Sequence, residues 1–448
     1  MSGNDVSVKG DLKPSFIDPA ADLHHIRVRW GPDVVIEKSL SRIGKGWAGL
    51  WSFFDPPDKE NIMIGKTTFK DTLNRLRDAV CAFGLLLSLA VAPAYGQQVH
   101  QLFYDNGWND SNLDGPATPV SGLGAFATSP NNGLHVYYLS STDEVHQAYN
   151  VGGGWHDENL TAEAHGPAAN DGSNVVGFSV GNLQYVFYVG DDFEIHQLLY
   201  NNSVWTDTNL NLWGAPESDG VEIAAFVTTP NNALHVYYVE PGPRVIQAYN
   251  VGSGWQFQDL TGLTDGGQPE GRTLTGFSMG NLQYIYYIAF GGDVHQLFYN
   301  NASWTDEDLT ALAKAVPSPE YPNGAITAMV VPDTKKLRVY YIGTNNHVIQ
   351  LASTNNVKWT SADLTKKTKG PLADSTNGAV AFATTPNKQI HVYYASGGHV
   401  NQLFLPTPAT TWQNSDLTAL THGGLATYTG EMAGFSIGNE QYVYYLAQ

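Results

Sequence analysis

The 448-residue sequence is poor in cysteine and in charged side chains. Its single cysteine, Cys81, lies within the first hundred residues. Disulfides and cysteine-ligated metal sites are therefore excluded from the rest of the chain, whose stability must come from packing. Charged residues make up 15% of the chain, and the formal net charge is −19. Because an acidic surface repels phosphate backbones, we expect no nucleic-acid partner.

Arginine and helical periodicity are also scarce. After Gln97 the only arginines are Arg244, Arg272 and Arg338. No segment of useful length in this region has apolar residues at helical spacing. Asn, Gln, Thr and Tyr are abundant there instead, between short β-branched and aromatic runs. This composition is typical of an all-β protein whose surface interacts through neutral hydrogen-bonding groups.

One apolar run stands out, residues 79–92. It is short for a membrane span, which needs about 20 apolar residues. A positively biased segment beginning at Met63 precedes it, and Ala92-Pro93-Ala94 follows, an order typical of a secretory signal peptide. We therefore predict a signal-peptide-like segment at 63–96, an unassigned extension at 1–62 upstream of the true start, and a secreted protein, extracellular or periplasmic. The alternative is an uncleaved anchor with a cytoplasmic tail; the mature domain itself is expected to make no stable membrane insertion.

Seven copies of one sequence unit fill residues 97–448, with starts about fifty residues apart. Each copy is predicted to contain four strands separated by turns with Pro-Asn-Asn, Gly-Asn or several glycines. The third strands follow the pattern VHQAY and begin at Val99, Val145, Ile195, Val245, Val294, Val348 and Val400. Four-stranded units repeated in this way indicate an all-β, seven-bladed β-propeller of four-stranded blades.

The two ends of the repeat region are complementary. It begins with a third and a fourth strand, at 99–113, and ends with a first and a second strand, at 432–446. Joined, these segments complete one blade and remove the exposed edges of an open array. We therefore predict that the last blade is closed by both termini. The alternative is an open solenoid, which would need distinct capping repeats.

Three positions in each unit are candidates for sugar binding. The fourth strand begins with a tryptophan: Trp108, Trp155, Trp205, Trp255, Trp304, Trp359 and Trp412. The third strand carries a glutamine: Gln101, Gln147, Gln197, Gln247, Gln296, Gln350 and Gln402. The second strand carries an early polar residue: His135, Gln184, His235, Gln283, Arg338, His391 and Gln441. An indole can stack on the apolar face of a sugar, and amides and imidazoles can bond its hydroxyls. The competing interpretation is structural, because packing of blade on blade also repeats regularly.

The units are of two types. One has Pro-Asn-Asn before LHVYY, and the other has GFSxGN before LQYxYY. The types alternate through the first four units and again through the last two. This alternation predicts two classes of site between blades. The unit with Arg338 departs most from both types.

The succession of xHVYY or xRVYY, a turn, VxQ, a glycine-rich turn and tryptophan resembles the fungal fucose-specific lectin family, the Aleuria-type β-propeller lectins, over all of 97–448. The resemblance, to a relative with seven repeats as in bacterial members, implies a secreted propeller that binds glycans or glycoconjugates multivalently between blades. In that family an arginine on the second strand and a glutamate on the third bind fucose. Arg338 alone matches the arginine, and every repeat has a glutamine in place of the glutamate. Amide and imidazole groups thus replace the charged pair, and bond hydroxyls without charge.

Catalysis is not expected. A glycoside hydrolase needs two carboxylates across the scissile bond, and acids such as Asp143-Glu144 and Asp191-Asp192 lie in predicted turns. The sequence contains no G-x-S-x-G, H-E-x-x-H or phosphate-loop motif, and no calcium loop. We therefore expect no enzyme activity, no catalytic residue, no cofactor and no metal site. A propeller that presents its loops to a protein partner is the main alternative, and a glycoside hydrolase is the weaker one.

Overall fold

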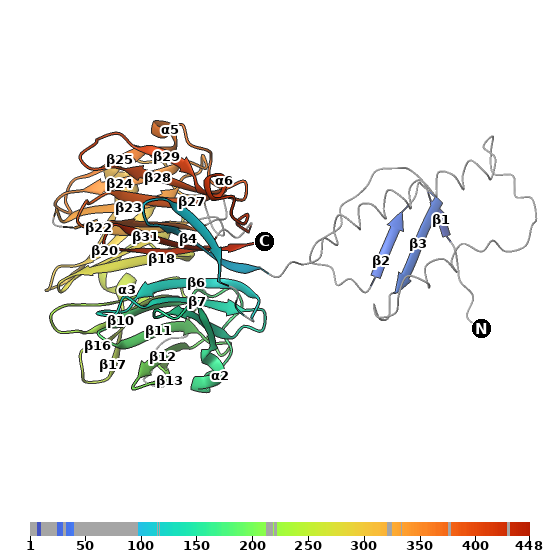
Figure 1. Cartoon of the computed structure of the whole chain (residues 1–448), viewed down its shortest axis with the longest axis horizontal. Coiled ribbons are helices and arrows are strands. Elements are labelled where there is room, and N and C mark those ends of the chain that lie inside the picture. The colour runs from blue at the N-terminus through green and yellow to red at the C-terminus, as the bar shows by residue number, and fades with distance from the viewer. Residues whose placement is uncertain are drawn as a thin grey trace, which may run out of the picture. The chain divides into compact units, whose positions relative to one another are not determined.

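We describe the protein from a computed structural model, in two units, Met1–Val91 and Ala92–Gln448. The structure describes residues 7–9, 25–29, 33–39 and 97–448, without 114, 116, 212–217, 219–221, 320–324, 333, 375–377 and 428–430. In the first unit, β1 (Ser7–Lys9), β2 (His25–Arg29) and β3 (Asp33–Ser39) form an antiparallel sheet in the order β1-β3-β2 (Figure 1). This sheet has no counterpart in the sequence prediction for residues 1–62. The predicted signal-peptide-like segment, 63–96, lies outside the described residues.

The second unit consists of seven antiparallel four-stranded sheets, which we call blades 1 to 7. Blade 1 is β6 (Pro119–Ala127), β7 (Leu134–Ser140), β8 (Val145–Asn150) and β9 (His156–Asn159); blade 2 is β10 (Val176–Val180), β11 (Leu183–Val189), β12 (Ile195–Asn201) and β13 (Val204–Asn209); blade 3 is β14 (Ile223–Val227), β15 (Leu234–Glu240), β16 (Arg244–Asn250) and β17 (Trp255–Asp259). Blade 4 is β18 (Pro269–Met279), β19 (Leu282–Ala289), β20 (Val294–Tyr299) and β21 (Trp304–Asp308); blade 5 is β22 (Ile326–Val331), β23 (Lys336–Ile342), β24 (Val348–Ser353) and β25 (Trp359–Asp363). Blade 6 is β26 (Ala379–Ala383), β27 (Ile390–Ser396), β28 (His399–Leu405) and β29 (Gln413–Asp416); blade 7 is β30 (Met432–Ile437), β31 (Glu440–Ala447), β4 (Gln98–Tyr104) and β5 (Trp108–Asn112).

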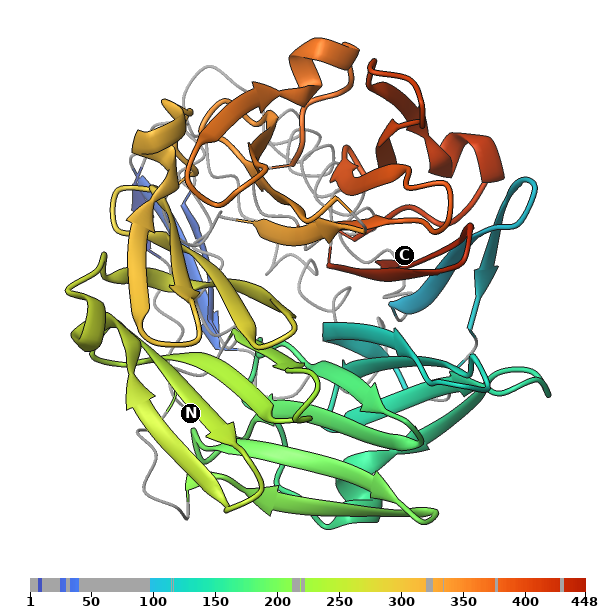
Figure 2. The same cartoon turned by 90° about the vertical axis from the view of Figure 1, so that its left-hand side faces the viewer.

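The blades form a ring, seen face-on in Figure 2. The first strand of each blade contacts the first strand of the next, and β30 of blade 7 contacts β6 of blade 1. The predicted fold class, an all-β propeller of seven four-stranded blades, is confirmed. Within blade 7, β31 pairs with β4 in antiparallel register, with Leu446 opposite Val99 and Gln441 opposite Tyr104.

The core lies between the blades, because the second strand of each blade is buried on both faces. In blade 3, Tyr237 packs in one cluster with Ile285 and Tyr287 of blade 4. The next residue, Tyr238, packs in another cluster with Phe187 and Val189 of blade 2. Successive side chains of a strand point to opposite faces, so the tyrosine pair contacts both neighbours at once. This explains why the VYY runs are apolar at consecutive positions.

Five short helices were not expected from the sequence: α2 (Leu160–Ala164), α3 (Leu260–Thr264), α4 (Leu309–Ala313), α5 (Leu364–Thr368) and α6 (Leu417–Thr421). Each begins after an Asp or Asn cap; Asp259, for example, accepts the Gly262 amide proton at 2.8 Å. Thr261 on α3 accepts the Val245 amide proton at 2.9 Å and ties the helix to its blade. Helices of a single turn leave no periodic signal. None of the helices in the described ranges combines the length and apolar character needed to cross a bilayer.

Candidate functional site

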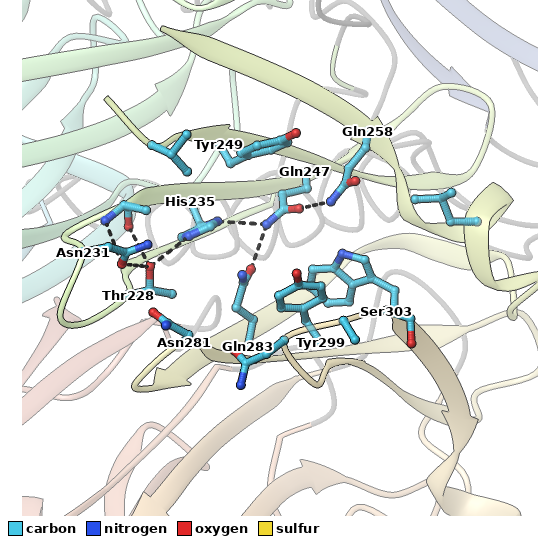
Figure 3. A pocket seen from close by; sticks show the side chains of 16 residues that line it. Thr228, Asn231, His235, Gln247, Tyr249, Gln258, Asn281, Gln283, Tyr299 and Ser303 are labelled. Atoms are coloured by element: carbon cyan, nitrogen blue, oxygen red, sulfur yellow. Dashed lines mark hydrogen bonds between the residues drawn. The ribbon is translucent and has the colours of Figure 1, made fainter. Parts of the chain in front are cut away.

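A pocket of about 700 Å³ lies between blades 3 and 4 (Figure 3). Blade 3 contributes the turn after its first strand, side chains of its other three strands and Leu263 of α3. Blade 4 contributes the turn after its first strand, its second and third strands, and the turn that leads into its fourth. The polar and aromatic side chains that line it are Thr228, Asn231, His235, Gln247, Tyr249, Gln258, Asn281, Gln283, Tyr299, Asn301, Ser303 and Trp304. No Asp, Glu, Lys or Arg is among the residues that line this pocket. It therefore offers neutral hydrogen-bonding groups and aromatic rings.

Gln247 is the centre of a buried network behind the pocket surface. Its Nε2 lies 2.9 Å from His235 Nδ1, 2.7 Å from the Tyr237 hydroxyl and 2.8 Å from Gln283 Oε1. Its Oε1 accepts a hydrogen bond from Gln258 Nε2, and the Tyr237 hydroxyl donates to Gln283 Oε1. The network joins three strands of blade 3 to the second strand of blade 4. It fixes the lining side chains relative to one another across the junction between the blades.

The network also sets the tautomer of His235. Because the Gln247 amide donates to Nδ1, the imidazole proton lies on Nε2, which faces Thr228 Oγ1 at 3.2 Å. The Thr228 hydroxyl donates in turn to Asn231 Oδ1 at 2.9 Å. Burial lowers the pKa of His235 to about 4, so the ring is uncharged at neutral pH. The chain of bonds thus positions Asn231, which is exposed at the edge of the pocket.

The centre of this network, in which a third-strand glutamine contacts a histidine of its own blade and a glutamine of the next blade, recurs at two other junctions. Between blades 1 and 2, Gln147 Nε2 lies 2.7 Å from His135 Nδ1 and 3.0 Å from Gln184 Oε1, beside a pocket of about 430 Å³. Between blades 6 and 7, Gln402 Nε2 lies 3.0 Å from His391 Nδ1 and 3.0 Å from Gln441 Oε1. Burial lowers the pKa of His135 and of His391 to about 4 as well. All three are junctions at which a repeat of the LHVYY type precedes one of the LQYxYY type.

The structure brings some of the predicted sugar-binding residues together and separates others. Those that line the two pockets are His135, Gln147, Gln184, Trp205, His235, Gln247, Gln283 and Trp304. Those that line neither are Trp155, Gln197, Trp255, Gln296, Arg338, Gln350, Trp359, His391, Gln402 and Trp412. A role in sugar binding stays a prediction for both groups. In the two pockets the histidines and glutamines are hydrogen-bonded to one another, so they form the floor of each pocket.

Most of the repeat tryptophans pack edge-on against an aromatic ring of the preceding blade. Trp304 lies 6.2 Å from Tyr237 at 72°, and Trp359 lies 6.4 Å from Tyr286 at 77°, measured between ring centroids and planes. Trp108, Trp155, Trp255 and Trp412 make the same T-shaped contact. This geometry supports the structural interpretation of the tryptophans. Trp205 and Trp304 also form a pocket wall, so at these two positions packing and a binding surface coincide.

Sequence reasoning missed the lining residues that lie in turns and at the ends of third strands. Asn231 belongs to a Pro-Asn-Asn segment and Asn281 to a Gly-Asn segment, and both segments were interpreted only as turns. Tyr249 and Tyr299 end the third strands of neighbouring blades and face one pocket. The recurrence of asparagine and tyrosine at these places was visible in the repeats. Their convergence was not, because it depends on which blade ends meet.

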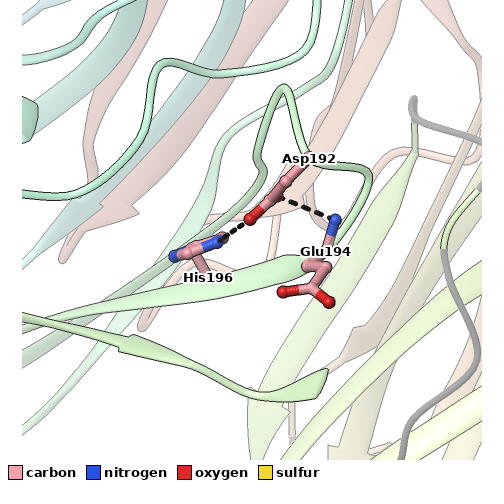
Figure 4. A group of neighbouring side chains, drawn as sticks. All are labelled: Asp192, Glu194 and His196. Carbon is pink, nitrogen blue, oxygen red and sulfur yellow. Dashed lines mark hydrogen bonds and ion pairs between the residues drawn. The ribbon is translucent and has the colours of Figure 1, made fainter. Parts of the chain in front are cut away.

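One group among the described residues has metal-ligand chemistry, Asp192, Glu194 and His196 in blade 2 (Figure 4). Their potential ligand atoms lie within 4.8 Å of one another. Both nitrogens of His196 are already engaged, since Nδ1 lies 2.9 Å from Asp207 Oδ2 and Nε2 lies 3.3 Å from Asp192 Oδ2. The contacts of His196 thus link the turn that carries Asp192 to the outer strand β13, which carries Asp207.

No family model matches the sequence, and no curated protein sequence is similar to it. Among solved structures, the chain is similar to AofleA from Arthrobotrys oligospora, at 14% identity over 78% of this chain and 92% of that one, with a TM-score of 0.48. It is similar to the Aleuria aurantia lectin in complex with α-methyl-L-fucoside, at 16% identity over 67% and 96% of the chains, with a TM-score of 0.48. A sialidase from Trypanosoma rangeli is also similar, at 11% identity over 77% and 57%, with a TM-score of 0.38. The seven-bladed fold rests on the strand pairing of this chain.

Proposed function

We propose that the protein is a secreted lectin-like propeller that binds glycans in pockets between blades, without catalysing a reaction on them. The observation that carries the proposal is the pocket between blades 3 and 4, which combines neutral hydrogen-bonding side chains with Tyr249, Tyr299 and Trp304. A sugar presents hydroxyls that both donate and accept, and apolar C–H faces that pack on aromatic rings. A lining without charged groups suits an uncharged sugar. The sequence resemblance makes L-fucose the first monosaccharide to test.

Repetition of the pocket supports multivalent binding. Aligned residues line a second pocket between blades 1 and 2, including Asn131, Tyr149 and Tyr200. Two weak sites on one rigid ring would gain avidity on a surface that carries many glycans, since the second contact becomes intramolecular. A soluble monosaccharide should therefore bind much more weakly than a dense glycan surface.

For the secreted state, amino-terminal sequencing of the exported protein tests whether the mature chain begins after the apolar run at 79–92.

Removing lining side chains at the blade 3 and 4 pocket should weaken sugar binding without unfolding the protein. Asn281 is exposed and Tyr299 is half-buried at the pocket wall. Loss of one hydrogen bond in Asn281→Ala should lower affinity about 3- to 10-fold. Loss of the ring in Tyr299→Ala should lower it further. Binding is identified on a glycan array, competed with the free monosaccharide and quantified by calorimetry.

The matched control is Gln413→Ala, which changes an exposed residue on β29 away from both pockets. Its affinity and melting temperature should equal those of the unaltered protein. The proposal is wrong if no glycan is bound, or if Asn281→Ala and Tyr299→Ala bind the selected glycan at full affinity. A protein-interaction propeller would instead lose its partner on changes to surface loops, and free sugar would not compete.

A further inference from the structure

The two pockets share a scaffold but differ in charge. Glu158 lies opposite Gln147 in blade 1, as Gln258 lies opposite Gln247 in blade 3. Glu163 is the fourth residue of α2, as Leu263 is the fourth residue of α3. Glu158 and Glu163 both line the pocket between blades 1 and 2, and Gln258 and Leu263 line the other. One pocket therefore carries two carboxylates where its counterpart carries an amide and an alkyl group.

The carboxylate of Glu158 cannot donate the hydrogen bond that the amide of Gln258 donates at the same position of blade 3. Gln258 Nε2 donates to Gln247 Oε1 and so completes the buried network of blade 3. An ionised carboxylate has no proton to donate to Gln147. Glu158 instead accepts a hydrogen bond from the Tyr149 hydroxyl at 2.8 Å, on the pocket side of the network. Blade 1 thus lacks the hydrogen bond to the third-strand glutamine, and the carboxylate of Glu158 places a negative charge at the pocket wall.

Nothing in the lining of this pocket neutralises the two charges. The lining contains no lysine or arginine, and His135, its only basic side chain, is uncharged because burial lowers its pKa to about 4. Partial burial and the charge of Glu158 raise the pKa of Glu163. The hydrogen bond to Glu158 is the main cause that raises the pKa of Tyr149 to about 12. Both effects show a local excess of negative charge that a bound cation would relieve.

Two aromatic rings, Tyr200 and Trp205, form a wall of the same pocket. Tyr200 lies 5.2 Å from Trp205 between ring centroids and lines the pocket beside it. The aromatic wall would favour a cation as well as an apolar sugar face.

We propose that the pocket between blades 1 and 2 binds a sugar with a free amino group, whose ammonium form pairs with Glu158 and Glu163 while an apolar face of the sugar packs on the aromatic wall of Tyr200 and Trp205. The assignment rests on the proposed glycan-binding function and adds a substrate class for one of its pockets. It makes the ring bispecific, because the pocket between blades 3 and 4, without carboxylates, would take an uncharged sugar.

Calorimetry on the full chain near neutral pH tests the inference with D-glucosamine, N-acetyl-D-glucosamine and D-glucose. Two charge-assisted contacts should make D-glucosamine bind at least about tenfold more tightly than the two uncharged sugars, at one amine-dependent site per chain. The double variant Glu158→Gln with Glu163→Leu restores the residues of the other pocket and should abolish this preference. The reciprocal double variant, Gln258→Glu with Leu263→Glu, should create a second amine-dependent site.

The outcomes separate this inference from the function on which it rests. Equal affinity for D-glucosamine and D-glucose would overturn the amine preference and leave the glycan-binding proposal intact. A glycan array and calorimetry that show no sugar bound at all would overturn both. If n-butylamine bound as tightly as D-glucosamine, the pocket would be a general ammonium site, and the sugar assignment would be wrong. Retention of the preference in the Glu158→Gln, Glu163→Leu variant would also overturn it.

Discussion

Acidification from pH 6.5 to pH 4 should destabilise the propeller strongly through three buried histidines. Burial lowers the pKa of His135, His235 and His391 from 6.5 to about 4. In this window the unfolded chain binds a proton at each ring and the folded chain does not, so the free energy of unfolding falls as the pH falls. Between these two pH values each histidine costs about 2.6 kcal/mol, and the three together about 8 kcal/mol. A loss of that size equals the whole stability of a typical domain, so we expect acid unfolding within this range.

A second set of histidines acts in the opposite direction and must be separated from the first. Burial lowers the pKa of His196 and His295, but hydrogen bonds and the charges of Asp207 and Asp306 outweigh it and raise the pKa overall. Their stabilisation is fully present below pH 6.5 and is lost as the pH rises through the folded pKa. Their contribution therefore changes little between pH 6.5 and pH 4, and they cannot be the cause of the acid loss.

The variant His235→Gln isolates one member of the buried set. Glutamine occupies the corresponding second-strand position in the neighbouring blade, as Gln283, and does not titrate. In urea unfolding at a series of pH values, this variant should lose about 2.6 kcal/mol less than the unaltered protein between pH 6.5 and pH 4. His156→Gln, at an exposed position on β9, is the control and should leave the pH dependence unchanged. A pH dependence identical in all three proteins would contradict the assignment.

The blade architecture was predictable from the sequence because it is encoded locally. Each strand is a short β-branched or aromatic run, each turn carries Gly, Asn or Pro, and the unit recurs seven times. The strands that begin at Val99, Val145 and Ile195 lie within β4, β8 and β12 as predicted. Single-turn helices such as α3 escaped prediction, because their stability comes from the Asp259 cap and the Thr261 contact to the blade.

The candidate site was predictable only in part, because its contacts join residues far apart in the sequence. The sequence identified His235, Gln247 and Gln283 as recurring polar positions between blades. It could not show that Gln247 and Gln283, 36 residues apart, bond each other and so form the floor of the pocket. The residues that remain open to a ligand, such as Asn281 and Tyr299, come from turns and strand ends. Which of these converge depends on blade twist and ring size, which no local pattern records.

Truncating a repeat tryptophan should separate packing from binding, and Trp359 gives the clearest case. Its side chain is 4% exposed, packs edge-on against Tyr286 of the preceding blade and lines neither pocket. Trp359→Ala should cost about 3–5 kcal/mol of unfolding free energy, because it removes a buried ring and leaves a cavity. Sugar affinity of the molecules that stay folded should be unchanged. Thermal and urea unfolding measure the first effect, and calorimetry below the melting temperature measures the second.

Two companion variants make the result decisive. Trp359→Phe keeps one aromatic ring and removes the rest of the indole, including an N–H that has no partner among the described residues, so its loss of stability should be smaller than that of Trp359→Ala. Trp304→Ala changes a half-buried ring that also lines the pocket between blades 3 and 4, so it should lower sugar affinity as well as stability. If Trp359→Ala abolished sugar binding in the folded protein and left the melting temperature unchanged, the tryptophan would be a ligand contact. The division of the ring into binding and packing junctions would then be wrong.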